Sequence, residues 1–116
     1  MTQINATLFP NAEAWLIENM PDMEVDSVSA IQRSTPLELV KERSTTFIDT
    51  EENTSKELTL QDFVRALALL AELIDGKKLY VGCLDSASEL TDPCNWDVEV
   101  VDAHWQLAYH GEVIYG

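Results

Sequence analysis

Basic residues are scarce in this chain. Its 116 residues include 7 Lys and Arg against 21 Asp and Glu, so the formal net charge is -14 and the pI is about 4.2. Residues 1–32 and 79–116 contain no Lys or Arg. Nucleic acids and anionic membranes are bound mainly through these two residue types, and their scarcity argues against either partner. A charged partner is therefore expected to present a basic surface.

Long apolar runs are missing as well. No run approaches the roughly 18 apolar residues of a membrane-spanning helix. The first residues, MTQINATLF, lack the basic start and long apolar centre of a signal peptide. We therefore expect a cytoplasmic protein with no membrane partner, in which the two cysteines, Cys83 and Cys94, stay reduced.

Signatures of common catalytic sites are also lacking. There is no glycine-rich phosphate loop and no serine-histidine-acid order, so we expect no enzyme and no cofactor. One alternative is a metal-dependent or acid/base enzyme, and its acid/base form is suggested by Asp97, Glu99, Asp102 and His104, which lie close in sequence. On a strand, Asp97 and Glu99 would share a face, where paired carboxylates can raise a pKa for acid catalysis. An exposed polar strand explains the same residues with fewer assumptions.

A metal site has weak support in the sequence. Cys83, Cys94, His104 and His110 form a C-x10-C-x9-H-x5-H series of ligand-type residues. Structural zinc sites usually include a short ligand pair such as C-x2-C, which this series lacks. On a strand, His104 and His110 would also lie about 20 Å apart. The expectation is that no metal is bound.

The clearest element present is a long amphipathic helix over residues 60–75. Its apolar residues recur at three- and four-residue steps and predict one face directed at a core: Leu60, Phe63, Val64, Leu67, Leu70, Ala71 and Ile74. Thr59 and Asp62 have the spacing of an N-terminal capping box. Gly76 is expected to end the helix in a left-handed conformation, with Lys77 and Lys78 beside the negative end of the dipole.

Weaker patterns precede this helix. Alternation predicts an opening strand over residues 2–8, and Asn11 can cap a short helix that runs to about Asn19 and closes at Met20-Pro21. One short strand is expected within residues 23–31 and one or two within 37–48. Residues 51–57 are polar and acidic, so they are predicted to form an exposed loop.

Strands are predicted after the helix. Residues 79–84 and 96–100 alternate, a one-residue slip at Val100-Val101 suggests a β-bulge, and alternation resumes over 103–109. His110-Gly111 would turn into a last strand at 112–115. The alternative is a short helix over 103–110, capped by Asp102 and ended by Gly111. Together the patterns predict one α+β domain, residues 1–116, with an antiparallel sheet of four to six strands, the long helix across a face and the N-terminal helix beside it.

A second apolar row lies off the main face of the long helix. Leu69 and Leu73 form this row on the side of Arg65, Asp62 and Glu72. Such a row is either buried in the monomer or exposed as an interface. A structural module that forms a homodimer through Leu69 and Leu73 is therefore one alternative function.

The distribution of charge supports the leading hypothesis. We expect a small non-enzymatic protein that binds a basic protein surface, with an interaction face that includes Glu89, Asp92, Asp97, Glu99 and Asp102. A DNA duplex as long as a domain of this size carries roughly 20 phosphate charges, close to the number of carboxylates here. The protein could therefore mimic a nucleic acid and block a nucleic-acid-binding partner, as an accessory protein of a phage or mobile element would.

Overall fold

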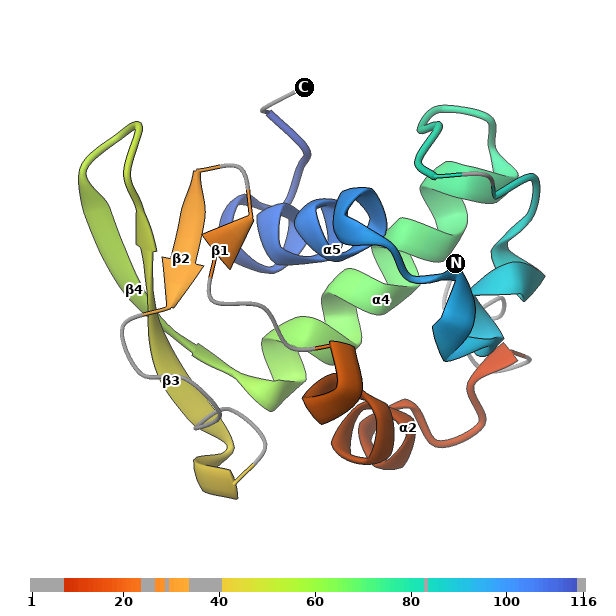
Figure 1. Cartoon of the computed structure of the whole chain (residues 1–116), viewed down its shortest axis with the longest axis horizontal. Coiled ribbons are helices and arrows are strands. Elements are labelled where there is room, and N and C mark those ends of the chain that lie inside the picture. The colour runs from red at the N-terminus through yellow and green to blue at the C-terminus, as the bar shows by residue number, and fades with distance from the viewer. Residues whose placement is uncertain (1–7, 24–26, 29, 34–40, 83, 115–116) are drawn as a thin grey trace.

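Two long helices, closed at one end by a small antiparallel sheet, form the body of the protein. The computed structural model describes residues 8–23, 27–28, 30–33, 41–82 and 84–114. In Figure 1 the sheet lies at the left, and helices α4 and α5 run from it to the right, with α2 below them. The α+β class is thus confirmed. The elements in chain order are α2 (Ala12–Asn19), η1 (Met20–Met23), β1 (Ser27–Val28), β2 (Ile31–Arg33), β3 (Ser44–Asp49), β4 (Thr54–Thr59), α4 (Leu60–Asp75), η2 (Ala87–Thr91), η3 (Pro93–Asn95) and α5 (Val98–His110).

The predicted central helix is α4, and its N-terminal cap is confirmed. The Thr59 side chain accepts a hydrogen bond from the Asp62 backbone N–H, while the Asp62 carboxylate accepts one from the Thr59 N–H. The C-terminal prediction was wrong in one respect: Gly76 has φ of -81°, and Lys77 takes the left-handed conformation at φ of 57°. The main neighbour of α4 is α5, not the sheet that was expected beneath it.

The sheet has the order β1-β2-β3-β4, and every neighbouring pair is antiparallel. The expected four to six strands are found only in part, because β1 has two residues and three longer strands make up most of the sheet. The predicted exposed loop at 51–57 is confirmed only for the turn at 51–53; residues 54–57 are exposed as predicted but belong to β4, which pairs with β3. Leu58 is the only buried residue of β4. The other residues of this edge strand are exposed and mostly polar, and a polar exposed segment looks like a loop in the sequence.

Some predicted strands fall wholly or partly outside the described residues. These are the opening strand at 2–8, of which residues 2–7 are not described, and the 37–48 segment, of which residues 37–40 are not described and residues 44–48 belong to β3. The one strand expected within 23–31 is instead two short strands, β1 and β2. The N-terminal helix is confirmed as α2, whose Asn11 cap accepts from the Ala14 N–H.

The C-terminal third is helical where strands were predicted. Helix α5 replaces the strands at 96–100 and 103–109, and it begins five residues before the alternative helix, with Asp97 as its N-cap. Gly111, at φ of 79°, ends it. Residues 79–82 and 84 form no strand either, because the Lys78 and Leu79 N–H groups bond to the Leu73 carbonyl and turn the chain back over the end of α4.

Aromatic side chains join the two helices to the sheet. Phe47 of β3 packs against Phe63 of α4 and Trp105 of α5, with ring centroids 5.4 and 5.2 Å apart. His104, the residue before Trp105, is buried against Phe63 and Trp96. These contacts form the centre of the core. No helix in the described part of the chain is long and apolar enough to cross a membrane.

Candidate interaction surface

Three of the predicted interaction carboxylates cap helical turns. Glu89 accepts hydrogen bonds from the backbone N–H groups of Asp85 and Ser86, at 2.6 and 3.1 Å, at the start of η2. Asp92 and Asp97 are themselves N-cap residues: Asp92 accepts from the Cys94 N–H at the start of η3, and Asp97 accepts from the Val100 N–H at the start of α5. Each carboxylate therefore satisfies backbone donors that a helical start leaves unpaired, and it lies at the end of the helix dipole that favours negative charge.

Glu99 is held by a different contact. Its Oε1 accepts a hydrogen bond from the Gly82 N–H at 2.8 Å. Gly82 has φ of 55°, and a Cβ at this position would lie 3.0 Å from the Asp97 Oδ2. The backbone of Gly82 thus lies directly against two carboxylates, Asp97 and Glu99, and its lack of a side chain allows this approach.

Asp102 differs from these four carboxylates in its contacts, because it bonds to a side chain and not to the backbone. Its side chain is half-buried on α5 and accepts a hydrogen bond from the Gln106 Nε2 at 3.0 Å. Burial raises the pKa of the Asp102 carboxyl above its usual value, and the Gln106 hydrogen bond offsets part of that rise. Asp102 therefore contributes more to the packing of α5 than to a surface for a partner.

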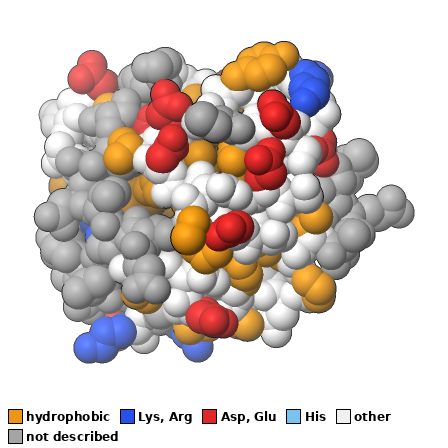
Figure 2. Space-filling model, turned by 45° about the vertical axis from the view of Figure 1, so that its right-hand side comes forward, with side chains coloured by type: hydrophobic (Ala, Val, Ile, Leu, Met, Phe, Trp, Pro, Cys, Tyr) orange, Lys and Arg blue, Asp and Glu red, His pale blue; other side chains and the backbone are white. Residues whose placement is uncertain are grey.

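The remaining four carboxylates, Glu89, Asp92, Asp97 and Glu99, lie in the segment from η2 to the first turn of α5 and are here called the acidic end. Apolar side chains are exposed at and near this end. Val98, between two of the carboxylates, is 63% exposed, and Tyr80, two residues before Gly82, is 78% exposed. Figure 2 shows this side of the molecule, where acidic and apolar side chains are interspersed and Lys and Arg lie near the margins. The acidic end is a mixed surface of negative charge and apolar area.

The second apolar row of α4 lines a groove. Leu69 and Leu73 are half-buried, because the segment that follows α5 lies over part of them. The groove has a volume of about 380 Å³. Its other lining residues come from α4, the turn after it and the end of α5: Glu72, Lys78, Leu79, Leu107, Gly111, Glu112 and Val113. The row is thus partly covered by the chain's own C-terminal segment and is not a flat exposed seam.

The three described members of the cysteine and histidine series, Cys94, His104 and His110, form no common ligand group. Cys94 is exposed on η3, and Cys83 lies outside the described residues. His104 is fully buried, with its Nε2 3.0 Å from the Phe63 carbonyl oxygen, and burial lowers its pKa to about 4. His110 lies in the last turn of α5, 2.7 Å from Asp49. His104 therefore serves the core, and it is not a partner of Asp97 and Glu99 for acid/base catalysis.

One group of ligand-type side chains was not predicted. Within the described ranges, the only such group of three or more is Asp49, Glu52 and His110, whose ligand atoms all lie within 4.8 Å of one another. Asp49 is fully buried at the end of β3. Its Oδ1 accepts from the Glu51 and Glu52 N–H groups at 2.9 and 3.0 Å, and its Oδ2 faces the His110 Nε2. His110 is 61 residues away in sequence, so no local pattern could reveal the group.

Comparison of the chain with models of known protein families, with curated proteins and with solved structures finds no match.

Proposed function

We propose that this protein is a small, non-enzymatic, acidic interaction protein that binds a basic protein surface through the acidic end. The observation that carries the proposal is the exposed side chain of Val98, the residue that separates Asp97 from Glu99 in the chain. Negative charge selects a basic partner, and the apolar area supplies surface that gains from leaving water. Tyr80 adds an aromatic side chain of a type enriched among energetically dominant interface residues.

The charge of the whole chain would assist the encounter. A formal net charge of -14 attracts a basic partner over a distance comparable to the Debye length, about 8 Å at physiological salt. Association should therefore slow as salt is added. Apolar contacts would resist salt, so part of the affinity would remain when the electrostatic part is screened.

Mimicry of a nucleic acid is a narrower form of this proposal. A duplex as long as the molecule's largest extent, 33 Å, carries roughly 20 phosphates in two continuous rows. The carboxylates of the acidic end are positioned by the backbone N–H groups that they bond to, and two exposed apolar side chains, Val98 and Tyr80, lie close to them in the chain. This arrangement suits a partner whose basic surface also has apolar area better than a partner whose surface binds only phosphates.

The test must remove charge without removing caps. Asn is about as good a helix N-cap as Asp, and the side-chain oxygen of Gln can still accept a backbone hydrogen bond. The test variant therefore combines Glu89→Gln, Asp92→Asn, Asp97→Asn and Glu99→Gln. A control variant removes four charges away from the acidic end, through Glu13→Gln, Glu42→Gln, Glu51→Gln and Glu57→Gln, each at an exposed residue. Asp97→Lys is avoided because it would remove the cap of α5. Asp102→Lys is avoided because it would place a cation in a half-buried position.

Both variants and the unaltered protein are immobilised, and nuclease-treated lysate of the source organism is passed over them and eluted with a salt ramp. The proposal expects a basic protein that is retained by the unaltered protein and by the control variant, and lost from the acidic-end variant. Equal retention by both variants would refute the acidic end as the binding surface. A different outcome is that the immobilised protein captures only further copies of itself. If the resulting dimer survives high salt and is broken by Leu69→Glu, the proposal is replaced by assembly through the groove.

A further inference from the structure

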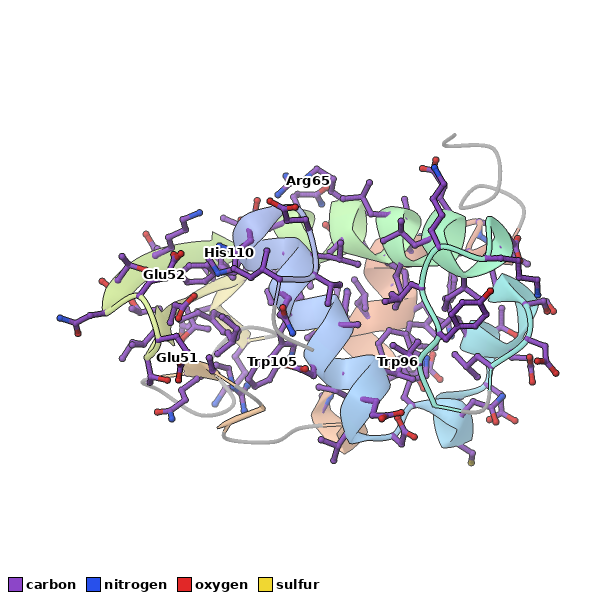
Figure 3. The ribbon with its side chains drawn as sticks, turned by 90° about the horizontal axis from the view of Figure 1, so that it is seen from above. Glu51, Glu52, Arg65, Trp96, Trp105 and His110 are labelled. Carbon is purple, nitrogen blue, oxygen red and sulfur yellow. The ribbon has the colours of Figure 1, made fainter. Side chains whose placement is uncertain are left out.

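The contact between hairpin β3–β4 and the last turn of α5 contains three side chains that commonly bind metal ions. We propose that Asp49, Glu52 and His110 bind one divalent transition-metal ion, with Zn²⁺ as the representative ligand. Figure 3 shows Glu52 on the side of the hairpin loop nearer to His110, with Glu51 further away. This inference does not depend on the proposed partner.

The donor set suits such an ion. Two carboxylates and one imidazole combine oxygen and nitrogen ligands that Zn²⁺ accepts, and imidazole favours transition metals over Mg²⁺ and Ca²⁺. Three protein ligands would leave a coordination position for water. In the metal-free protein the His110 Nε2–H donates to the Asp49 carboxylate, so the ring must carry its proton on Nδ1 instead before Nε2 can bind an ion.

Asp49 is already held in position for this role. Its buried carboxylate is oriented by two backbone N–H groups on Oδ1, so Oδ2 is directed at the His110 Nε2 at 2.7 Å. With metal bonds of 2.0–2.2 Å to each atom, a tetrahedral ion between them would need a nitrogen-oxygen distance of about 3.3 Å. The His110 Nε2 and Asp49 Oδ2 would therefore have to move apart by about 0.6 Å. Rotation of the His110 side chain at the end of α5 allows a movement of this size.

Glu52 completes the group from the loop. Its side chain is exposed, and it can therefore turn its carboxylate toward an ion without disturbing the core. The hairpin itself is fixed against α5 by Lys56, whose Nζ donates to the Tyr109 carbonyl at 2.7 Å, and by Thr54, whose hydroxyl lies 2.8 Å from the Tyr109 hydroxyl. A bound ion would thus find two of its ligands on elements already in contact.

The test uses the full chain after removal of metals, titrated with ZnCl2 by calorimetry and with CoCl2 by visible absorption, which reports the ligand geometry. The decisive pair is Glu52→Gln and Glu51→Gln, which change adjacent exposed carboxylates of one loop. We expect one ion per chain. Loss of a group that only orients a ligand typically weakens a metal site 10–100-fold, so loss of the direct ligand Glu52 should weaken binding by at least about tenfold, while Glu51→Gln leaves it unchanged.

Two further variants test the histidine ligand and the exposed thiol. His110→Ala should abolish binding, with circular dichroism as a check that it folds, and Cys94→Ser should leave binding unchanged although Cys94 is an exposed thiol. The proposal is overturned if no saturable binding occurs up to millimolar Zn²⁺, if Glu52→Gln and Glu51→Gln bind equally, or if Cys94→Ser removes the site.

Discussion

Lowering the pH from 7.5 to 5.0 should destabilise the folded state through one side chain, His104. Its ring is buried between Phe63 and Trp96, with centroids 5.2 Å from each, and its Nε2 lies 3.0 Å from the Phe63 carbonyl. Burial lowers the pKa of His104 to about 4, while the Phe63 hydrogen bond opposes that shift. In the unfolded chain a histidine titrates near 6.5.

The sign and size of this change in folding stability follow from the protons that the folded and unfolded states bind. Between pH 6.5 and 4 the unfolded state takes up a proton at His104 and the folded state does not, so stability falls as the pH falls through this window. From pH 7.5 to 5.0 the loss is about 2 kcal/mol. Asp102 acts in the opposite direction, because its raised pKa lets the folded state bind a proton first at low pH. The repulsion of a net charge of -14 also falls on acidification.

A comparison with His104→Gln isolates the contribution of His104. Gln does not titrate, and its amide N–H can donate to the Phe63 carbonyl. Urea unfolding is followed by tryptophan fluorescence at pH 7.5 and 5.0 and at constant ionic strength. Contributions of Asp102 and of net charge occur in both proteins and cancel in the difference. The unaltered protein should lose about 2 kcal/mol more than the variant over this interval; an equal loss in both would refute the reasoning.

Two local predictions can be measured by the same unfolding assay. Thr59→Ala should destabilise the protein by about 1 kcal/mol because it removes the hydroxyl that caps α4, and Thr59→Ser should restore the loss; an Ala variant as stable as the original would show that the cap is energetically unimportant. Gly111→Ala, at φ of 79° with open space around it, should cost about 1–2 kcal/mol. Gly82→Ala should cost more, since its Cβ would also lie 3.0 Å from the Asp97 carboxylate, and equal losses would contradict that contact.

Helix α4 could be predicted because its local pattern and its environment agree. One side is buried and the other is exposed, so the 3.6-residue period is visible, and Thr59 and Asp62 mark the start. Helix α5 lacks that agreement. From Val100 to Tyr109 every residue except Asp102 is buried, so no polar side interrupts the apolar positions. A helix buried on nearly all sides has no amphipathic period, and the chance alternation around Trp105 indicated a strand instead.

The local roles of the candidate site residues could not be predicted for a related reason. Carboxylates at 89, 92 and 97 accept hydrogen bonds from the backbone at helical starts, and a strand prediction excludes such starts. Asp49 and Glu52 lie in segments whose patterns indicated a strand and an exposed loop. Their relation to His110 arises from tertiary packing alone, and it cannot be derived from the spacing of residues in the chain.

The contacts between hairpin β3–β4 and α5 have a consequence for the order of folding. They join residues 53 to 61 positions apart, while the hairpin and α4 are made by the ribosome well before α5. A two-stranded hairpin alone is marginally stable in water, and Phe47 and Phe63 remain uncovered until Trp105 and His104 arrive. The nascent chain should therefore depend on chaperones until the last helix emerges, and fragments that end before Val98 should not fold.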